Sequence, residues 1–216
     1  MWCSVGGEAL ARTCPRCHRP AYWEIHGPIL LSSNDKIVDT PWDLEVLAAT
    51  LVKAPRQGRA MMGTDDCKPV SVSRRIEAPA GAIFKLLAQP DRHPEFDGSA
   101  MLRRGATNDV ITGLGDVFVT KMYFEAMGDY EMHNRVVAFE TDRCIAWEPG
   151  NPELDRNGSR WRYDLAPDGL NATVVTETYD CTDSPESVRE AVDNGNAWLA
   201  GMRETLERLD QLCTAQ

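Results

Sequence analysis

Long apolar runs are absent from this 216-residue sequence, and so is the pattern of a secretory signal. A bilayer-spanning helix takes about 20 consecutive apolar residues, and no run approaches that length. The first residues include Glu8 and no extended apolar core, unlike a cleavable leader. We therefore expect a cytoplasmic protein without an integral membrane segment.

Motifs of familiar catalytic sites are absent as well. The sequence contains no nucleophile elbow, phosphate-binding loop, paired-carboxylate motif or zinc-protease motif. No reaction follows from a motif, and whether the protein is an enzyme stays open at this stage.

Positive charge is in short supply. The chain has 23 Lys and Arg against 33 Asp and Glu, a formal net charge of −10. The imbalance lies after residue 68, where 15 basic side chains stand against 25 acidic ones. A net negative surface disfavours nonspecific binding to nucleic acid or to an anionic membrane. We therefore expect no nucleic-acid partner, whereas the oligomeric state does not follow from the sequence.

The seven cysteines are odd in number and irregular in spacing, which indicates reduced thiols in a cytoplasm. Cys14 and Cys17 stand two apart before His18, a spacing that holds one side of a tetrahedral zinc site. A second such pair is missing, so the motif is half a zinc ribbon. It also matches covalent haem attachment, which requires export. Incidental cysteines are the preferred interpretation and structural zinc the alternative. No other cofactor is expected.

Residues 1–60 differ from the rest of the chain in their sequence pattern and are interpreted as an N-terminal extension. One helix is predicted over 39–52, with Thr40 as its cap and Pro41 in its first position. Residues 53–59 have the composition of a linker. Met61 and Met62 leave open that 1–60 lies upstream of the true start.

Residues 69–216 have the pattern of an α+β domain. A strand containing Val70 and Val72 leads to a short helix after Pro79, and Pro90 ends that helix. Strands separated by turns follow, which predicts an antiparallel sheet with one buried face. They are expected at 99–104, 116–124, 130–139, 144–147, 160–165 and 173–179.

A long C-terminal helix is expected to cover the buried face of the sheet. Ser184 is the predicted cap, Pro185 the predicted first residue, and Asn194–Asn196 the predicted site of a kink. Its apolar stripe consists of Val188, Val192, Trp198, Leu199, Met202, Leu206, Leu209 and Cys213.

The order of motifs resembles the START/Bet v 1-like superfamily (SRPBCC), in particular its bacterial polyketide cyclase/dehydrase and lipid-transport branch. The resemblance runs over about residues 69–213. It implies a helix-grip fold: a curved antiparallel sheet around a long C-terminal helix, with a hydrophobic cavity between them. This fold hosts carriers, cyclases, hydrolases and regulators, so it leaves the function open. The segments that carry the resemblance are 76–79, 90–97, 113–118, 135–147, 160–165 and 173–177.

Large side chains on the expected inner faces are the candidate ligand-binding residues. Aromatic rings and methionine suit flat or irregular hydrophobic ligands. The alternative is that these residues simply fill the core. They are Phe96, Phe118, Met122, Trp147, Trp161, Tyr163, Trp198 and Met202.

Few polar side chains are candidates for catalysis. Glu177 shares the face of Val175 and Tyr179, which the register turns inward, although a shift by one residue would place it in solvent. The resemblance places His93 in a loop near the cavity mouth. Tyr163 and Tyr123 are possible proton donors, but the resemblance carries no catalytic signature residue by residue.

These observations favour a protein that binds a hydrophobic small molecule, such as a lipid, a polyketide or an aromatic metabolite. The first alternative is an enzyme of the polyketide cyclase or dehydratase type that uses the same cavity. The second is a regulatory or interaction protein in which the N-terminal extension is the docking module.

Overall fold

The structure, a computed structural model, describes residues 67–103, 110–125, 128–152 and 155–214. The N-terminal extension, its expected helix and the Cys14–Cys17 pair lie outside these ranges and stay predictions. So does the boundary of the domain at residue 69. The C-terminal domain is therefore the part of the chain on which function can be argued.

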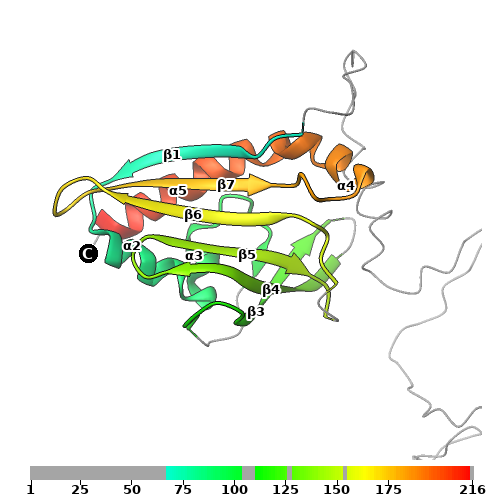
Figure 1. The fold of residues 1–216 in the computed structure, drawn as a ribbon, viewed down its shortest axis with the longest axis horizontal. Coiled ribbons are helices and arrows are strands. Elements are labelled where there is room, and N and C mark those ends of the chain that lie inside the picture. The colour runs from blue at the N-terminus through cyan, green and yellow to red at the C-terminus, as the bar shows by residue number, and fades with distance from the viewer. Residues whose placement is uncertain (1–66, 104–109, 126–127, 153–154, 215–216) are drawn as a thin grey trace, which may run out of the picture. The chain divides into compact units, whose positions relative to one another are not determined.

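One antiparallel sheet of seven strands forms the body of the domain (Figure 1). Consecutive strands from β2 to β7 are neighbours in the sheet, and β1 pairs with β7, where Val72 lies opposite Glu177. In spatial order the strands are β1 (Val70–Ile76), β7 (Thr173–Asp180), β6 (Arg160–Pro167), β5 (Cys144–Gly150), β4 (Gly128–Glu140), β3 (Val117–Phe124) and β2 (Leu102–Arg103).

The sheet curls into a half-barrel, and one of its faces is buried. Buried and partly exposed residues alternate along β7, as expected for a strand with one face against a core. The register between β4 and β5 shifts between Val136 and Ala138, and such irregularities bend a strand and increase its twist. The expected antiparallel sheet is confirmed.

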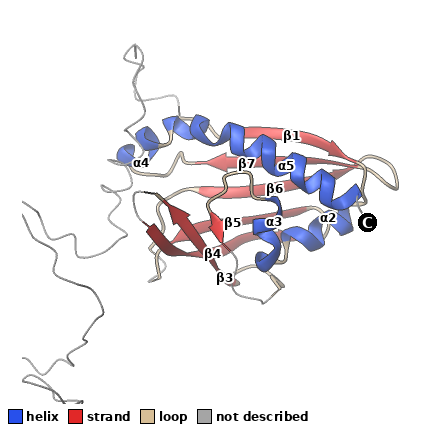
Figure 2. Cartoon of the chain, turned by 180° about the vertical axis from the view of Figure 1, so that it is seen from behind, coloured by secondary structure: helices blue, strands red, loops and turns tan. Residues whose placement is uncertain are grey.

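The helices lie against the concave face of the sheet (Figure 2). After β1 come α2 (Ala80–Leu87), the 3₁₀ turn η1 (Pro90–Arg92) and α3 (His93–Phe96). The long α5 (Leu199–Thr214) runs along β1 and carries the buried side chains of Met202, Leu206 and Leu209. The predicted helix-grip arrangement is confirmed. No helix within the described residues is long and apolar enough to span a membrane, and the cytoplasmic location stays a prediction.

The kink predicted at Asn194–Asn196 is present and divides the C-terminal helix. It separates α4 (Glu186–Ala191) from α5, with the 3₁₀ segment η2 (Asp193–Trp198) between them. Asn194 and Gly195 have φ of 51° and 91°, the left-handed region that favours glycine and tolerates asparagine. At Gly195 a Cβ would lie 3.0 Å from Cγ2 of Val70, so a larger residue would also crowd β1.

The predicted cap of this helix is wrong. Pro185 is the N-cap residue, and no side chain caps the helix. Ser184 therefore stands one position too early for its hydroxyl to reach the first free N–H groups of the helix. Its Oγ is buried without a hydrogen bond.

Candidate functional site

A pocket of about 220 Å³ lies between the concave face of the sheet and the helices α3, α4 and α5. All eight residues predicted from the sequence to contact a ligand line it, although their role in binding stays a prediction. The sheet contributes Phe118, Met122, Trp147, Trp161 and Tyr163, and the helices contribute Phe96, Trp198 and Met202.

The aromatic rings of the pocket form two clusters. In the first, the ring of Trp147 lies 5.5 Å from His93, 5.4 Å from Phe118 and 5.7 Å from Tyr163, measured between centroids. The second consists of Trp161, Tyr179 and Trp198. Its closest pair is Trp161 and Tyr179 at 4.6 Å, and Trp198 lies 6.2 Å from both.

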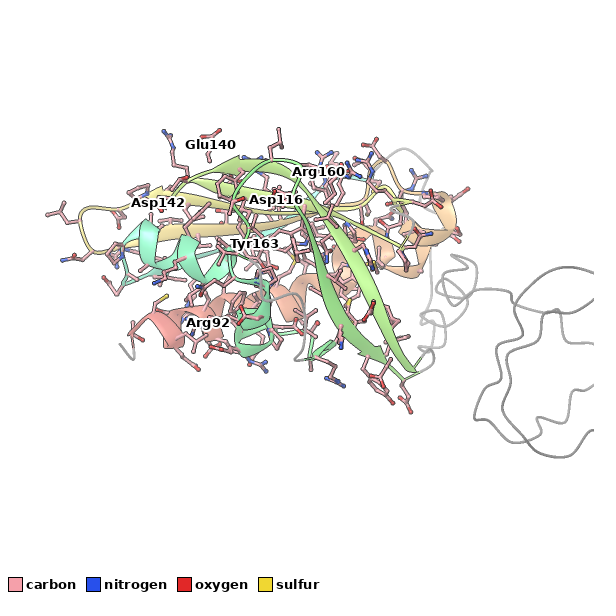
Figure 3. The ribbon with its side chains drawn as sticks, turned by 90° about the horizontal axis from the view of Figure 1, so that it is seen from below. Arg92, Asp116, Glu140, Asp142, Arg160 and Tyr163 are labelled. Carbon is pink, nitrogen blue, oxygen red and sulfur yellow. The ribbon has the colours of Figure 1, made fainter. Side chains whose placement is uncertain are left out.

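The first cluster ends at the most strongly perturbed carboxyl group of the described residues. Glu177 on β7 lies directly opposite Tyr163 on β6, and the Tyr163 hydroxyl donates a 2.8 Å hydrogen bond to Oε1 of Glu177. Figure 3 shows Tyr163 between the sheet and the helices, whereas Glu140 projects from the outer face. Glu177 is only 3% exposed, and its second oxygen, Oε2, has no hydrogen-bond partner. The inward register expected for Glu177 is therefore the observed one.

Burial dominates the electrostatics of this pair. It raises the pKa of Glu177 to about 8, helped by the negative charge of Asp97, while the hydrogen bond from Tyr163 acts in the opposite direction. The pKa of Tyr163 is also raised well above its usual value, by burial and by Glu177. At neutral pH the pocket therefore contains a carboxylic acid in its protonated form, which can donate a hydrogen bond.

His93 is not in a loop at the cavity mouth, contrary to what the resemblance implied. It begins α3 and is buried, and its Nε2 lies 2.8 Å from the Leu87 carbonyl oxygen. Because only a protonated nitrogen can donate to that oxygen, Nε2 carries the hydrogen. Burial lowers the pKa of the ring, which keeps it neutral. The helical turn between Pro90 and Pro94, where a loop was expected, turns the ring inward.

Tyr123 cannot serve as a proton donor in the pocket. Its side chain is 38% exposed on the outer face of β3, and the Arg103 guanidinium lies 5.0 Å from its ring centroid. Successive side chains of a strand point to opposite faces, and the neighbouring Met122 points inward.

No family model matches this chain. The uncharacterized protein Rv0088 of Mycobacterium tuberculosis is 34% identical over 117 residues, which are 53% of this chain and 49% of that protein. The chain thus spans about half the length of the curated relatives it matches.

Solved structures resemble the described domain. Protein Ms6760 of Mycobacterium smegmatis superimposes with a TM-score of 0.51 at 18% identity, over 68% of this chain and 91% of that chain. The described domain has a helix-grip fold. The Polyketide_cyc-like protein Cgl2372 of Corynebacterium glutamicum superimposes with a TM-score of 0.49 at 20% identity, over 68% of this chain and 91% of that chain.

Several residues that line the helix-grip pocket escaped the sequence analysis. Tyr130, Met132 and Asn134 alternate along β4 and face the space, as does Thr120 on β3. Asn134 donates from Nδ2 to Oγ1 of Thr120 at 3.1 Å and to the Met132 carbonyl oxygen at 3.1 Å. The signal that could have found them is the alternation of side chains along β4.

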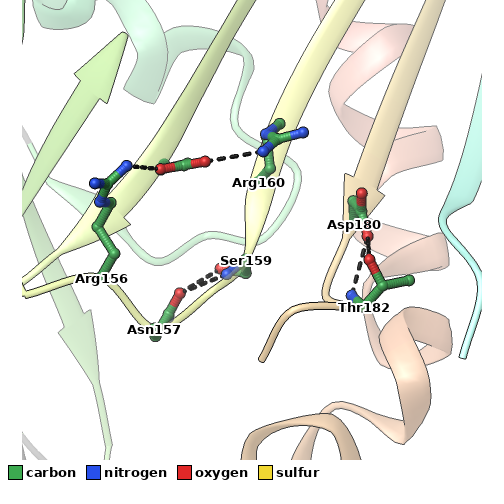
Figure 4. A network of polar contacts seen from close by, with 7 residues as sticks. Arg156, Asn157, Ser159, Arg160, Asp180 and Thr182 are labelled. Carbon is green, nitrogen blue, oxygen red and sulfur yellow. Dashed lines mark hydrogen bonds and ion pairs between the residues drawn. The ribbon is translucent and has the colours of Figure 1, made fainter. Parts of the chain in front are cut away.

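Polar contacts order the end of the helix-grip pocket where β6 begins (Figure 4). Oδ1 of Asn157 accepts hydrogen bonds from the Ser159 backbone N–H at 3.0 Å and from its hydroxyl at 2.6 Å, and both residues line the pocket. Beside them, Glu148 accepts from Arg156 and from Arg160, the latter at 2.9 Å. The described residues contain no cluster of three or more potential metal ligands.

Proposed function

We propose that this chain binds a hydrophobic small molecule, such as a lipid, a polyketide or an aromatic metabolite, in the pocket between sheet and helices. The observation that carries the proposal is a space of about 220 Å³ that two aromatic clusters line without filling. Protein interiors are otherwise close-packed, with few voids larger than a water molecule. A space of this size supports a site for a small ligand, since pockets for drug-sized molecules begin at about 300 Å³.

Binding would be driven by the removal of apolar surface from water. About half of the residues in the pocket walls are aromatic or methionine, and their side chains present broad surfaces to a flat ligand and adapt to its shape. The few polar groups, above all Glu177, would fix the orientation of the ligand.

The substitution Trp161→Ala tests this function, with 2-acetylnaphthalene as the probe and calorimetric titration as the measurement. We expect the affinity of the full chain to fall by about tenfold or more, because a ring of the pocket wall is lost. The free energy of unfolding of the unliganded chain should fall by less than about 2 kcal/mol, below the cost of deleting a fully packed ring.

Leu165→Ala is the matched control on the same strand. Leu165 is buried but does not line the pocket. Its truncation should lower the free energy of unfolding by about 2 to 5 kcal/mol and leave the probe affinity within about twofold. If Trp161→Ala instead lowered stability and affinity in the same proportion, Trp161 would be an ordinary core residue.

Native mass spectrometry of the full chain purified from its own host would define the ligand class. A hydrophobic molecule released on unfolding supports the proposal and gives its mass. Protein that carries no small molecule, and that also fails to bind aromatic probes, would contradict it.

A second candidate function, an enzyme of the polyketide cyclase or dehydratase type, is favoured by the Tyr163–Glu177 pair. A protonated carboxyl group with a pKa near neutrality is suited to general acid–base catalysis. Incubation with a poly-β-keto thioester, followed by mass spectrometry, tests it. Conversion that is lost in Glu177→Gln would support this function, and conversion no faster than in buffer would contradict it. The interaction role depends on residues 1–60 and stays a prediction.

A further inference from the structure

The described residues that line the pocket include no group that could neutralise an anion. Among the described residues that line it, there is no lysine or arginine. His93 is its single imidazole, and its Nε2 hydrogen is directed at the Leu87 carbonyl oxygen. An anionic ligand would therefore give up its hydration without gaining an opposite charge, which is costly in a buried site.

Two acidic side chains line the same space. Asp97 accepts hydrogen bonds from the backbone N–H and the hydroxyl of Ser99, at 2.9 and 2.7 Å, and from the N–H of Leu102 at 3.0 Å. Its oxygens are thus engaged in holding the loop after α3. Glu177 has no comparable set of partners, because only Oε1 is bonded, to Tyr163. The negative charge of Asp97 opposes the entry of a carboxylate, and Glu177, protonated at neutral pH, supplies no positive charge to offset it.

The buried hydrogen-bond donors of the pocket would be satisfied by an acceptor atom on a bound ligand. Glu177 receives the Tyr163 hydrogen on Oε1, so the proton of its acid form belongs on Oε2, which is buried and has no partner. The indole N–H of Trp198 is also buried, and the hydroxyl of Tyr179 is its weak acceptor. A buried donor without a partner loses free energy that an acceptor on a ligand would restore. An ammonium group has only donors to offer and would satisfy neither.

We propose that the pocket selects uncharged, predominantly aromatic ligands that carry a hydrogen-bond acceptor such as a ketone oxygen, with Glu177 as the donor, and that it rejects carboxylates. This inference rests on the proposed function, since it names the class of ligand for the same site. Fatty acids and aromatic acids are then poor ligands, whereas neutral ketones and quinones are good ones.

Four probes that share one ring system test the selectivity of the full chain. They are naphthalene, 2-acetylnaphthalene, 2-naphthoate and 2-naphthylmethylamine, and their dissociation constants are measured at pH 7 by quenching of tryptophan fluorescence. We expect 2-acetylnaphthalene to bind about fivefold more tightly than naphthalene, the gain from one buried hydrogen bond. The naphthoate should bind at least about tenfold more weakly than the ketone, because its charge is unpaired.

Variants of Glu177 and Trp198 test which donor produces the preference for the ketone over naphthalene. Glu177→Gln keeps an N–H donor at the same place and should keep the preference for the ketone over naphthalene. Glu177→Leu removes the donor and should abolish that preference while naphthalene itself still binds. Trp198→Phe keeps a ring without the indole N–H and is an independent second variant. It should reduce the preference if the indole contributes, and thermal unfolding of each variant verifies that it folds.

The outcomes separate this inference from the proposed function. Tight binding of the naphthoate, or of the amine in a manner lost in Glu177→Gln, would overturn the inference but leave a hydrophobic ligand pocket. Equal affinities for naphthalene and 2-acetylnaphthalene would likewise overturn the inference and leave a hydrophobic ligand pocket. Failure of all four probes to bind would overturn both.

Discussion

Glu177 is a carboxyl group that the fold buries with a single hydrogen bond. The bond from Tyr163 offsets part of the cost of removing it from water, but burial and the charge of Asp97 outweigh that bond. The result is a group that is neutral in the folded chain over a pH range where it is ionised in the unfolded chain. Its contribution to stability must therefore depend on pH.

The free energy of unfolding should decrease as pH rises from about 4.5 to about 8, the ordinary and the folded pKa values of Glu177. Across this range the folded chain retains a proton that the unfolded chain has released, so rising pH favours unfolding. The total effect is on the order of 4 to 5 kcal/mol, at 1.36 kcal/mol for each unit of pKa shift. Urea unfolding at a series of pH values measures it.

Glu177→Gln is the control, since it has the same shape and no ionisation. Subtracting its curve from that of the unchanged chain cancels the other titrating groups. The difference should fall toward pH 8 and then level off. A difference that is flat across this range would show that Glu177 is ionised in the folded state as well, and the protonated donor in the pocket would be lost with it.

The direction of a side chain could be analysed from the sequence where it depended on the alternation along one strand. Alternation along β7 put Glu177 on the face of Val175 and Tyr179, and the structure decides between the two registers left open by showing that this face is buried. The same rule applied to β3 excludes Tyr123, because Met122 already faces the pocket. His93 could not be placed this way, because its orientation depends on how a turn between two prolines packs against Leu87.

At the scale of elements, the loop after α3 is fastened to α5 and forms one wall of the pocket. The Gly98 N–H donates to Oγ1 of Thr205 at 2.9 Å, and Nη1 of Arg208 donates to the Asp97 carbonyl oxygen at 2.6 Å. The approach is so close that a Cβ on Gly98 would lie 2.2 Å from the Gly201 carbonyl oxygen. Only glycine fits there without displacing the backbone.

We predict that Gly98→Ala separates the loop from α5 and lowers the free energy of unfolding by about 2 to 3 kcal/mol, the usual cost of overpacking. Gly113→Ala is the matched control, because nothing lies within 4 Å of the added methyl group. The control should change stability by no more than about 0.5 kcal/mol. Urea unfolding of the two variants decides the matter, and equal effects would mean that the contact does not constrain the loop.

The C-terminal helix shows why local signals predict breaks better than caps. Asn194 and Gly195 favour left-handed backbone through their own chemistry, so the kink was visible in the sequence. The cap depended on a difference of one residue between Ser184 and Pro185, which composition does not resolve.

At the scale of the whole molecule, the sheet order followed from turns between neighbouring strands, which join consecutive elements. The closure of β1 onto β7 could not be obtained that way, because it links segments about a hundred residues apart. The pocket is also non-local. Eight lining residues could be named from the sequence, but the wall formed by β4 was missed, and the enclosed space depends on the curvature of the sheet and on the distance to α5.

The described core is formed by residues from Cys67 to Cys213. Its first described strand is β1, whose Val70 and Val72 pack against it. The Sγ atoms of Cys67 and Cys181 lie 3.6 Å apart, which brings the start of this region to the end of β7. A chain that begins at Cys67 thus contains every contact in these clusters.

We predict that a fragment of residues 67–216 unfolds cooperatively and binds 2-acetylnaphthalene within about twofold of the full chain, since it contains every described residue of the pocket and of the core. Thermal unfolding and fluorescence titration of both chains measure this. A fragment of residues 77–216 is the control. It lacks β1 and leaves the edge of β7 and the inner side of α5 unpaired, so it should lose cooperative unfolding. If the 67–216 fragment also failed to fold, residues 1–66 would belong to the structural unit, and the boundary predicted near residue 69 would be wrong.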